Sequence, residues 1–345
     1  MDTMQQLAYG LVVPAVNGET PQGELFDNLD TGQWAQLFQL MRQNNVVALT
    51  AATVTQLGER VPRSIKMPWL MECEKASSRY RMQADVEHDI KALMQEHGIK
   101  CMTLKGTHLS RYYPTPECRE FGDLDLYFFD RQADADRLMA DEHGVAISND
   151  AHHHTKYVYR GVTVESHYNF VNVHTPRSNR RYEQLLKSLA PSPTFELLFM
   201  LRHMAVHFAA SRITLRDLTD WHLATRQLEG SVDWDTVRKA AKDFGMAPFA
   251  DALTSIVSRR FNHEIPLRFA PENDIAEKVE HDMLFGSPQS EEYAANGWGR
   301  LSWKLRRYRA NRWKQRLVFN DSPLSLLLTS LGSHSRNPHS ILHKI

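Results

Sequence analysis

The order of apolar and polar residues along the chain predicts helices at both ends and strands in the middle. The apolar residues of 34–41 keep the spacing of one helix face, and Asp30 and Thr31 before them are candidate N-caps. One long helix, or two, is predicted for 69–97, because this stretch lacks Gly and Pro. Pro68 suits its start and Gly98 its end.

The composition changes at Ile99, where a short apolar segment predicts a buried strand. Three more strands are expected, the last two joined as a hairpin at Gly161. Asp130 is a candidate cap for a helix that runs to about His143. The predicted strands are 99–104, 124–129, 155–160 and 162–168.

The pattern is helical again from Pro193, with further helices predicted around Trp221 and after Asp233. We therefore expect an α+β protein in which a small mixed-sheet domain is flanked by helical regions. The expected parts are a helical region 1–98, a core 99–190, a helical domain 191–332 and a tail 333–345.

Composition removes several classes of protein. The 345 residues include 41 basic and 41 acidic side chains, so the formal net charge is zero, which is unlike a polybasic nucleic-acid coat protein. No apolar run is long enough for a transmembrane helix, and the start of the chain does not resemble a signal peptide. Three widely spaced cysteines favour a reducing, cytoplasmic setting.

The tripeptide Asp123-Leu124-Asp125 is the strongest chemical signal in the sequence. On a strand, residues two apart face the same side, so the two carboxylates repel each other unless a cation lies between them. Mg²⁺ prefers such oxygen ligands together with substrate phosphates. When the tripeptide is considered alone, the alternative interpretation is a pair of solvated aspartates at a strand edge.

The flanking segments favour the metal interpretation. Lys105-Gly106-Thr107 follows the first strand, and its glycine allows backbone N–H groups to approach a phosphate closely. Glu165, on the last strand, supplies a third carboxylate. A glycine turn, Asp-x-Asp and a strand-borne Glu, in that order, are the parts of a two-metal phosphoryl-transfer site.

These segments resemble a known family. Leu104 to Thr107, Gly122 to Leu126 and Val164 to Tyr168 look like the uncharacterised nucleotidyltransferase family of the polymerase-β-like superfamily. The resemblance reaches Asp217 and Trp234, and so covers most of the chain up to about Ala250.

The resemblance implies an enzyme that transfers a nucleoside monophosphate from ATP or another NTP to an unidentified small molecule, protein or RNA. Asp123, Asp125 and Glu165 would be catalytic and bind Mg²⁺ or Mn²⁺. The nucleotide would be bound by Lys105, Gly106, Thr107, Arg119 and His167. The alternative function is a protein with this fold that binds a nucleotide or RNA without turnover.

Arg119 and His167 have a second interpretation each. Arg119 can bind the triphosphate or hold a carboxylate by a bidentate pair, or be a surface arginine paired with Glu117 or Glu120. His167 can contact the substrate or be a hydrogen-bonded structural histidine.

Two further histidine patterns invite a chemical reading. Adjacent residues cannot all face one ion, so His152-His153-His154 is interpreted as a solvated loop rather than a metal site. Arg202 and His207 match a spacing found in helical ribonucleases, which makes ribonuclease activity a minor alternative.

The segment 300–316 carries eight basic residues and no acidic ones, interleaved with aromatic residues. Such a segment can bind nucleic acid or another polyanion, lie on a membrane surface, or form an ordinary solvated helix face. The apolar run 324–331 is predicted to be a docking helix.

Overall fold

The computed structural model describes the chain in two compact units. The described residues are 3–148, 154–172, 178–267, 269, 274–286 and 309–320. Unit 1 joins Met1–Asn149 with His154–Tyr168 and Thr214–Ala224, and unit 2 contains the rest of the chain. All eight residues of the predicted site belong to unit 1. The boundaries predicted at 98, 190 and 332 stay predictions.

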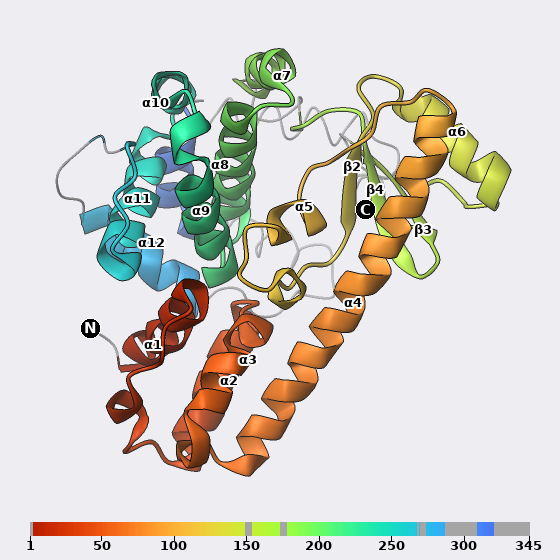
Figure 1. Cartoon of the computed structure of the whole chain (residues 1–345). Coiled ribbons are helices and arrows are strands. Elements are labelled where there is room, and N and C mark those ends of the chain that lie inside the picture. The colour runs from red at the N-terminus through yellow and green to blue at the C-terminus, as the bar shows by residue number, and fades with distance from the viewer. Residues whose placement is uncertain are drawn as a thin grey trace, which may run out of the picture. The chain divides into compact units, whose positions relative to one another are not determined.

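Unit 1 begins with a group of helices (Figure 1). Two tryptophans among them, Trp34 and Trp69, are fully buried. Trp34 stacks on Phe26 with ring centroids 5.5 Å apart, and the indole N–H of Trp69 donates to the Val47 carbonyl at 2.9 Å. The N-terminal helices and 3₁₀ turns are α1 (Thr3–Asn17), η1 (Gly23–Phe26), α2 (Thr31–Gln43), α3 (Val47–Gln56), η2 (Gly58–Arg60) and α4 (Arg63–Glu96).

Helix α2 starts where the sequence predicts. Asp30 accepts a hydrogen bond from the Gln33 backbone N–H at 2.8 Å, and the Gln33 side chain accepts one from the Asp30 backbone at 2.9 Å. This reciprocal capping box confirms Asp30 as the N-cap.

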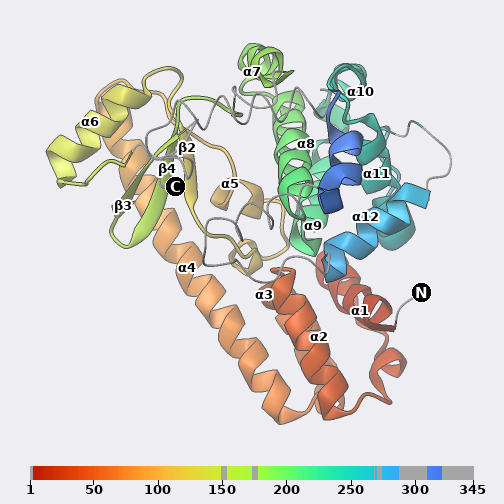
Figure 2. The same cartoon turned by 180° about the vertical axis from the view of Figure 1, so that it is seen from behind.

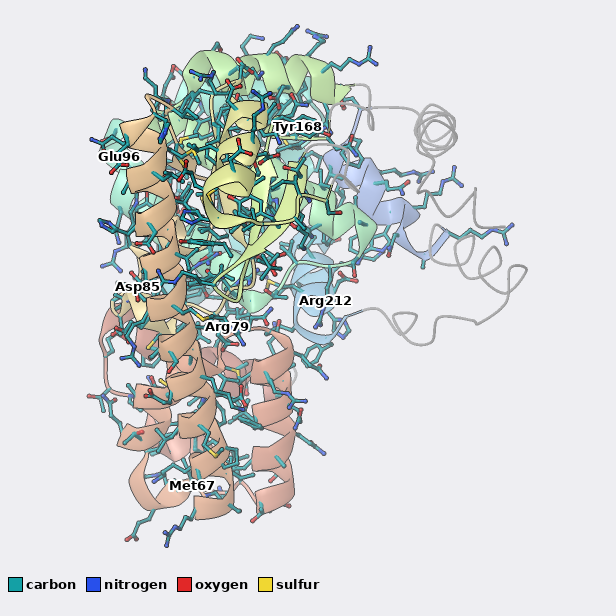
Figure 3. All side chains as sticks on the ribbon, turned by 90° about the vertical axis from the view of Figure 1, so that its right-hand side faces the viewer. Met67, Arg79, Asp85, Glu96, Tyr168 and Arg212 are labelled. Atoms are coloured by element: carbon teal, nitrogen blue, oxygen red, sulfur yellow. The ribbon has the colours of Figure 1, made fainter. Side chains whose placement is uncertain are left out.

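Helix α4 is longer than predicted and spans from the N-terminal helices to the sheet (Figure 2). Figure 3 shows Met67 near one end of this helix and Glu96 near the other. The predicted start at Trp69 is wrong, because Pro68 lies inside the helix. A proline removes one helical hydrogen bond, and burial of Ile65 and Trp69 on either side of it offsets that loss.

The end of α4 is as predicted. Gly98 has a φ of 65°, and the N–H groups of Gly98 and Ile99 donate to the carbonyls of Gln95 and Met94 at 3.1 and 2.8 Å. This is a Schellman motif, in which glycine takes the left-handed conformation without strain.

The sheet of unit 1 is mixed, which confirms the predicted α+β class. Its strands are β1 (Met102–Thr103), β2 (Leu124–Tyr127), β3 (His154–Tyr159) and β4 (Val162–His167). The strand order is β1-β2-β4-β3, and β2 and β4 are parallel while the other neighbours are antiparallel. Strand β1 is shorter than the predicted 99–104, because only Met102 and Thr103 have partners in β2 and Ile99 belongs to the end of α4.

The predicted hairpin is confirmed. Arg160 and Gly161 both have positive φ, 48° and 80°, as a two-residue type I′ turn requires. The turn sets the register of β3 against β4, from Tyr159 opposite Val162 to His154 opposite His167.

One face of the sheet is apolar and forms a core with two helices, α4 and α6 (Gln132–His143). Leu124, Leu126 and Val164 point into this core, so Asp123, Asp125 and Glu165 project from the opposite face. The predicted cap of α6 is wrong. Arg131 occupies the N-cap position, because Asp130 has a φ of 66° and belongs to the turn before it.

A short segment connects β1 to β2, and a later segment of the chain completes unit 1. The connection contains α5 (Thr107–Ser110) and η3 (Pro116–Cys118). The later segment, Thr214–Ala224, forms most of α9 (Leu215–Leu228). Within unit 1 the Leu215 N–H donates to the Asn44 side chain at 3.1 Å.

Unit 2 is helical among its described residues. Ser192 and Asp233 cap α8 and α10 by accepting backbone N–H bonds from Phe195 and Thr236, and both helices begin where the sequence predicts. Its helices are α7 (Ser178–Leu189), α8 (Pro193–Ala210), α10 (Trp234–Asp243), α11 (Ala247–Phe261), α12 (Asp274–Phe285) and 309–318, with η4 (Glu229–Ser231) between α9 and α10. No helix in the described part of the chain combines the length and apolar character needed to cross a membrane.

Only part of the basic segment falls among the described residues. Lys314 is fully buried, with its ammonium 2.6 Å from the Asp282 carboxylate. Arg309, Arg312 and Arg316 are exposed and share one face of helix 309–318. The remaining parts, namely 300–308, the run 324–331 and the tail 333–345, lie outside the described residues, as do His152 and His153.

Candidate active site

The site is built on the polar face of the sheet. Asp125 on β2 lies directly opposite Glu165 on the parallel strand β4, and Glu165 lies opposite Lys156 on β3. The next row on the same face contains His167 opposite His154. Strand register therefore gathers these side chains on one side of the sheet.

Asp125 is held between two basic groups. Its Oδ1 lies 2.9 Å from Lys105 Nζ and 3.0 Å from His167 Nε2, and the side chain is 5% exposed. Burial by itself would raise the pKa of this carboxyl, but Lys105 and His167 outweigh it and hold the pKa well below its usual range. Asp125 is therefore an anion in the folded protein.

Lys156 links the other two carboxylates. Its ammonium lies 3.4 Å from Asp123 Oδ2 and 3.4 Å from Glu165 Oε1, so those two oxygens are no more than twice that distance apart. His167 Nε2 is 3.7 Å from Glu165 Oε2 as well as 3.0 Å from Asp125. The structure thus brings all three predicted carboxylates to one place.

The turn after β1 runs beside the carboxylates. The Leu104 N–H donates to the Asp125 carbonyl at 3.0 Å, which sets the start of the turn. Gly106 then has φ 56° and ψ −120°, a backbone conformation that residues other than glycine strongly disfavour. Lys105 follows directly after Leu104, and its ammonium lies against the Asp125 side chain.

A carboxylate of α4 holds the other side of the turn. Glu87 accepts hydrogen bonds from the hydroxyls of Thr103, at 2.6 Å, and Thr107. Lys91 Nζ lies 2.6 Å from the same carboxylate. Burial opposes ionisation of Glu87, but its hydrogen bonds with Lys91, Thr103 and Thr107 lower its pKa. Thr107 therefore has a fixed hydroxyl orientation.

Arg119 is buried behind the turn and faces a carboxylate. Its guanidinium forms a bidentate pair with Asp220 of α9 at 2.7 and 2.8 Å, and donates to the Gly106 carbonyl at 3.2 Å. The Tyr113 hydroxyl donates to Asp220 at 2.7 Å. The interpretation of Arg119 as a surface residue is wrong, because the side chain is 4% exposed.

Four residues of this neighbourhood were not predicted as site residues: Glu87, His154, Lys156 and Asp220. His154 and Lys156 could have been predicted from the sequence, because the hairpin turn at Gly161 fixes which residues of β3 lie opposite those of β4. For Glu87 and Asp220 the contacts are tertiary and leave no local pattern in the sequence.

The structure describes His154, from the run of three histidines, and Arg202, from the ribonuclease-like spacing. His154 is in β3, 13% exposed and 3.5 Å from Glu165 Oε1, so the loop interpretation is wrong for this histidine. In unit 2, Arg202 is fully buried and donates to Asn179 Oδ1 and the Val318 carbonyl. A guanidinium bound in this way is not positioned to receive a phosphate.

The donor set suits a divalent cation. The ammonium groups of Lys105 and Lys156 and the imidazole of His167 contact these carboxylates, so this position already stabilises positive charge. Carboxylate oxygens are ligands for Mg²⁺ and Mn²⁺. His154, Glu165 and His167 also offer ligand atoms that all lie within 4.8 Å of one another.

Comparison with known proteins found one match. A family model described as an uncharacterised nucleotidyltransferase matches residues 30–262, a range that contains every residue of the site described above. No curated protein and no solved structure matches the chain.

Proposed function

Because the chain belongs to the uncharacterised nucleotidyltransferase family, we propose that it transfers a nucleoside monophosphate from an NTP to an acceptor with the help of Mg²⁺ or Mn²⁺. The observation that carries the proposal is the alignment of Asp125 and Glu165 on adjacent parallel strands, with Asp123 linked to Glu165 through Lys156. Carboxylates gathered around a cation position are what an enzyme acting on a polyphosphate requires.

Asp123, Asp125 and Glu165 would hold the metal. A bound divalent ion neutralises the phosphates and polarises the α-phosphorus for attack. Glu165, 17% exposed, is the carboxylate we assign to accept the proton of the acceptor group. The acceptor atom bonds to the α-phosphorus, the bond from that phosphorus to the β-bridging oxygen breaks, and pyrophosphate leaves.

The turn after β1 would receive the phosphates. Lys105 is 23% exposed, and its ammonium on a flexible stem can move from Asp125 to a phosphate oxygen. Gly106 is buried but has no side chain to crowd the turn, and the hydroxyl of the next residue, Thr107, donates to Glu87. His167 lies beside this turn with its Nε2 facing Asp125 and Glu165.

Arg119 has a different proposed role from the other members of the predicted nucleotide site. Its guanidinium is occupied by Asp220 and by the Gly106 carbonyl. These contacts support positioning of the turn rather than direct binding of the triphosphate.

The test is transfer of label from NTPs that carry it at either the α- or the γ-phosphate. Full-length protein is incubated with each NTP, Mg²⁺ or Mn²⁺, and a cell extract as the source of acceptors. We expect α-label on an acceptor and release of pyrophosphate. Transfer of γ-label would identify a kinase instead, and tight nucleotide binding without any transfer would support the non-catalytic alternative.

Matched variants assign the activity to this site. Asp125→Asn and Glu165→Gln should each lower transfer by at least about a hundredfold, because each removes a charge that faces the metal and the phosphates. Asp141→Asn, an exposed aspartate of α6 with the same chemistry, is the control and should keep full activity. Equal activity in the three variants would contradict the assignment.

A further inference from the structure

Two histidines converge on the third carboxylate of the site. His154 Nε2 lies 3.5 Å from Glu165 Oε1, and His167 Nε2 lies 3.7 Å from Glu165 Oε2. The two imidazole rings have centroids 5.0 Å apart. Their ligand atoms and that of Glu165 all lie within 4.8 Å of one another.

Strand pairing puts these groups there and limits how far they can separate. His154 and His167 are directly opposite each other in the β3–β4 hairpin, and Glu165 is two residues from His167 on the same face. His154 is 13% and His167 4% exposed, so both rings are held against the sheet.

The spacing is close to what one metal ion needs. Bonds of about 2.0–2.2 Å from a metal to imidazole nitrogen and carboxylate oxygen place neighbouring ligand atoms roughly 3–3.5 Å apart. The two His–Glu distances, one to each carboxylate oxygen, are close to this spacing, and all three ligand atoms lie within 4.8 Å of one another, so side-chain rotation would bring them onto one ion. Asp125 Oδ1 lies 3.0 Å from His167 Nε2, next to this group of three ligand atoms.

We propose that His154, Glu165 and His167 bind one first-row transition-metal ion beside Asp125, Zn²⁺ more tightly than Mn²⁺ and Mg²⁺ most weakly. Imidazole nitrogen is a good ligand for Zn²⁺ and a poor one for Mg²⁺, which prefers oxygen and water. The inference rests on the proposed function in that it names the metal class of the same carboxylate site.

Two lysines compete with the ion. Lys105 Nζ is 2.9 Å from Asp125 Oδ1, and Lys156 Nζ is 3.4 Å from Glu165 Oε1. Both side chains are partly exposed and can turn outward, which lets the ion replace their ammonium groups. Lys156→Met should therefore strengthen metal binding several-fold, because it removes a competing positive charge.

The test measures binding directly. Metal-free full-length protein is titrated with Zn²⁺, Mn²⁺ or Mg²⁺ without nucleotide, by calorimetry, and the Mn²⁺ complex is examined by pulsed electron paramagnetic resonance for coupling to imidazole ¹⁴N. We expect one ion per chain with Zn²⁺ tightest, and ¹⁴N coupling in the Mn²⁺ complex. Equal affinity for Mg²⁺ and Zn²⁺, or absence of ¹⁴N coupling, would overturn the proposal.

Histidine variants identify the ligands. His154→Ala should weaken Zn²⁺ binding at least about tenfold, since even partners outside the ligand set cost 10–100-fold. His167→Ala should do the same, and circular dichroism checks that this variant is folded. Two controls should bind as wild type: His88→Ala, on the exposed part of α4, and the double variant of His152 and His153. Loss of the site in either control, with wild-type binding by His154→Ala, would refute the assignment.

The metal-binding experiment and the transfer experiment can each refute one proposal without refuting the other. α-Label transfer with Mg²⁺, combined with unchanged Zn²⁺ affinity in His154→Ala, would refute the histidine site and leave the proposed function in place. A histidine-dependent Zn²⁺ site without transfer of any label would refute the proposed function and leave the metal site in place.

Discussion

Replacing Asp220 with asparagine removes the negative charge that neutralises buried Arg119. The two side chains are 5% and 4% exposed and share hydrogen bonds of 2.7 and 2.8 Å. Asparagine has the same size, but it has no charge, and its amide N–H groups would face the N–H groups of the guanidinium. The variant therefore leaves a positive charge buried without its partner.

The expected loss is large for a single substitution. Removing one partner of a buried ion pair costs about 3–5 kcal/mol of folding free energy, because the desolvated charge that remains is uncompensated. The Tyr113 hydroxyl, which donates to Asp220 at 2.7 Å, can keep an oxygen partner in the variant. We expect a loss within that range rather than above it.

Urea unfolding followed by circular dichroism measures the loss, with two comparisons. Asp235→Asn changes a carboxylate that is 94% exposed and pairs with Arg238, and should cost less than about 1 kcal/mol. The double variant Arg119→Met/Asp220→Leu should be more stable than Asp220→Asn alone, because it removes both charges.

The same pair supports the turn at Gly106, so the variant should also affect nucleotide binding. Arg119 donates to the Gly106 carbonyl, and its displacement frees the turn. We expect a higher KM for the NTP in Asp220→Asn and not in Asp235→Asn. A stability within about 1 kcal/mol of wild type would show that Arg119 is solvated, and would refute the buried pair.

Three further outcomes are expected. Gly106→Ala should cost about 1–3 kcal/mol in urea unfolding, since its φ of 56° strains any side chain, whereas Gly122→Ala, which has open space around it, should cost far less. Asp125→Asn should lower the melting temperature, because the carboxylate is paired with cations rather than repelled by its neighbours; a higher melting temperature would contradict this pairing. Burial opposes ionisation of Asp217, but Arg216 and the Thr214 hydrogen bonds lower its pKa from 3.8 to about 2. The charged Asp217 therefore stabilises the folded protein at pH values above the unfolded pKa, and this stabilisation is lost as the pH falls through about 2. The melting temperatures of wild type and Asp217→Asn should therefore differ at pH 5 and converge near pH 2, and a constant difference would show that this carboxyl has an ordinary pKa.

Local signals in the sequence determined many element boundaries. The cap at Asp30, the end of α4 at Gly98 and the turn at Gly161 depend on residues a few positions apart, whose hydrogen bonds and φ angles are set by residue type. Where tertiary packing outweighed a local rule, the prediction was wrong. Pro68 lies inside α4 because buried residues on both sides of it hold the helix together.

For the candidate site too, part could be predicted from the sequence and part depended on the tertiary structure. Asp123, Asp125, Glu165 and the turn at Gly106 were predicted from the sequence, because alternation along strands decides which carboxylates share a face. The fold decided what those carboxylates contact. Strand order placed Glu165 beside Asp125 although 39 residues separate them in the sequence.

Arg119 is the site residue whose partner the sequence by itself determined least. Its type allowed a phosphate, a surface carboxylate or a buried partner, and nothing within several positions distinguishes these possibilities. Packing of Thr214–Ala224 into unit 1 brought Asp220, which is 101 residues away, to its guanidinium. An ion pair forms wherever burial excludes water from two opposite charges, and burial is a property of the folded chain rather than of local sequence.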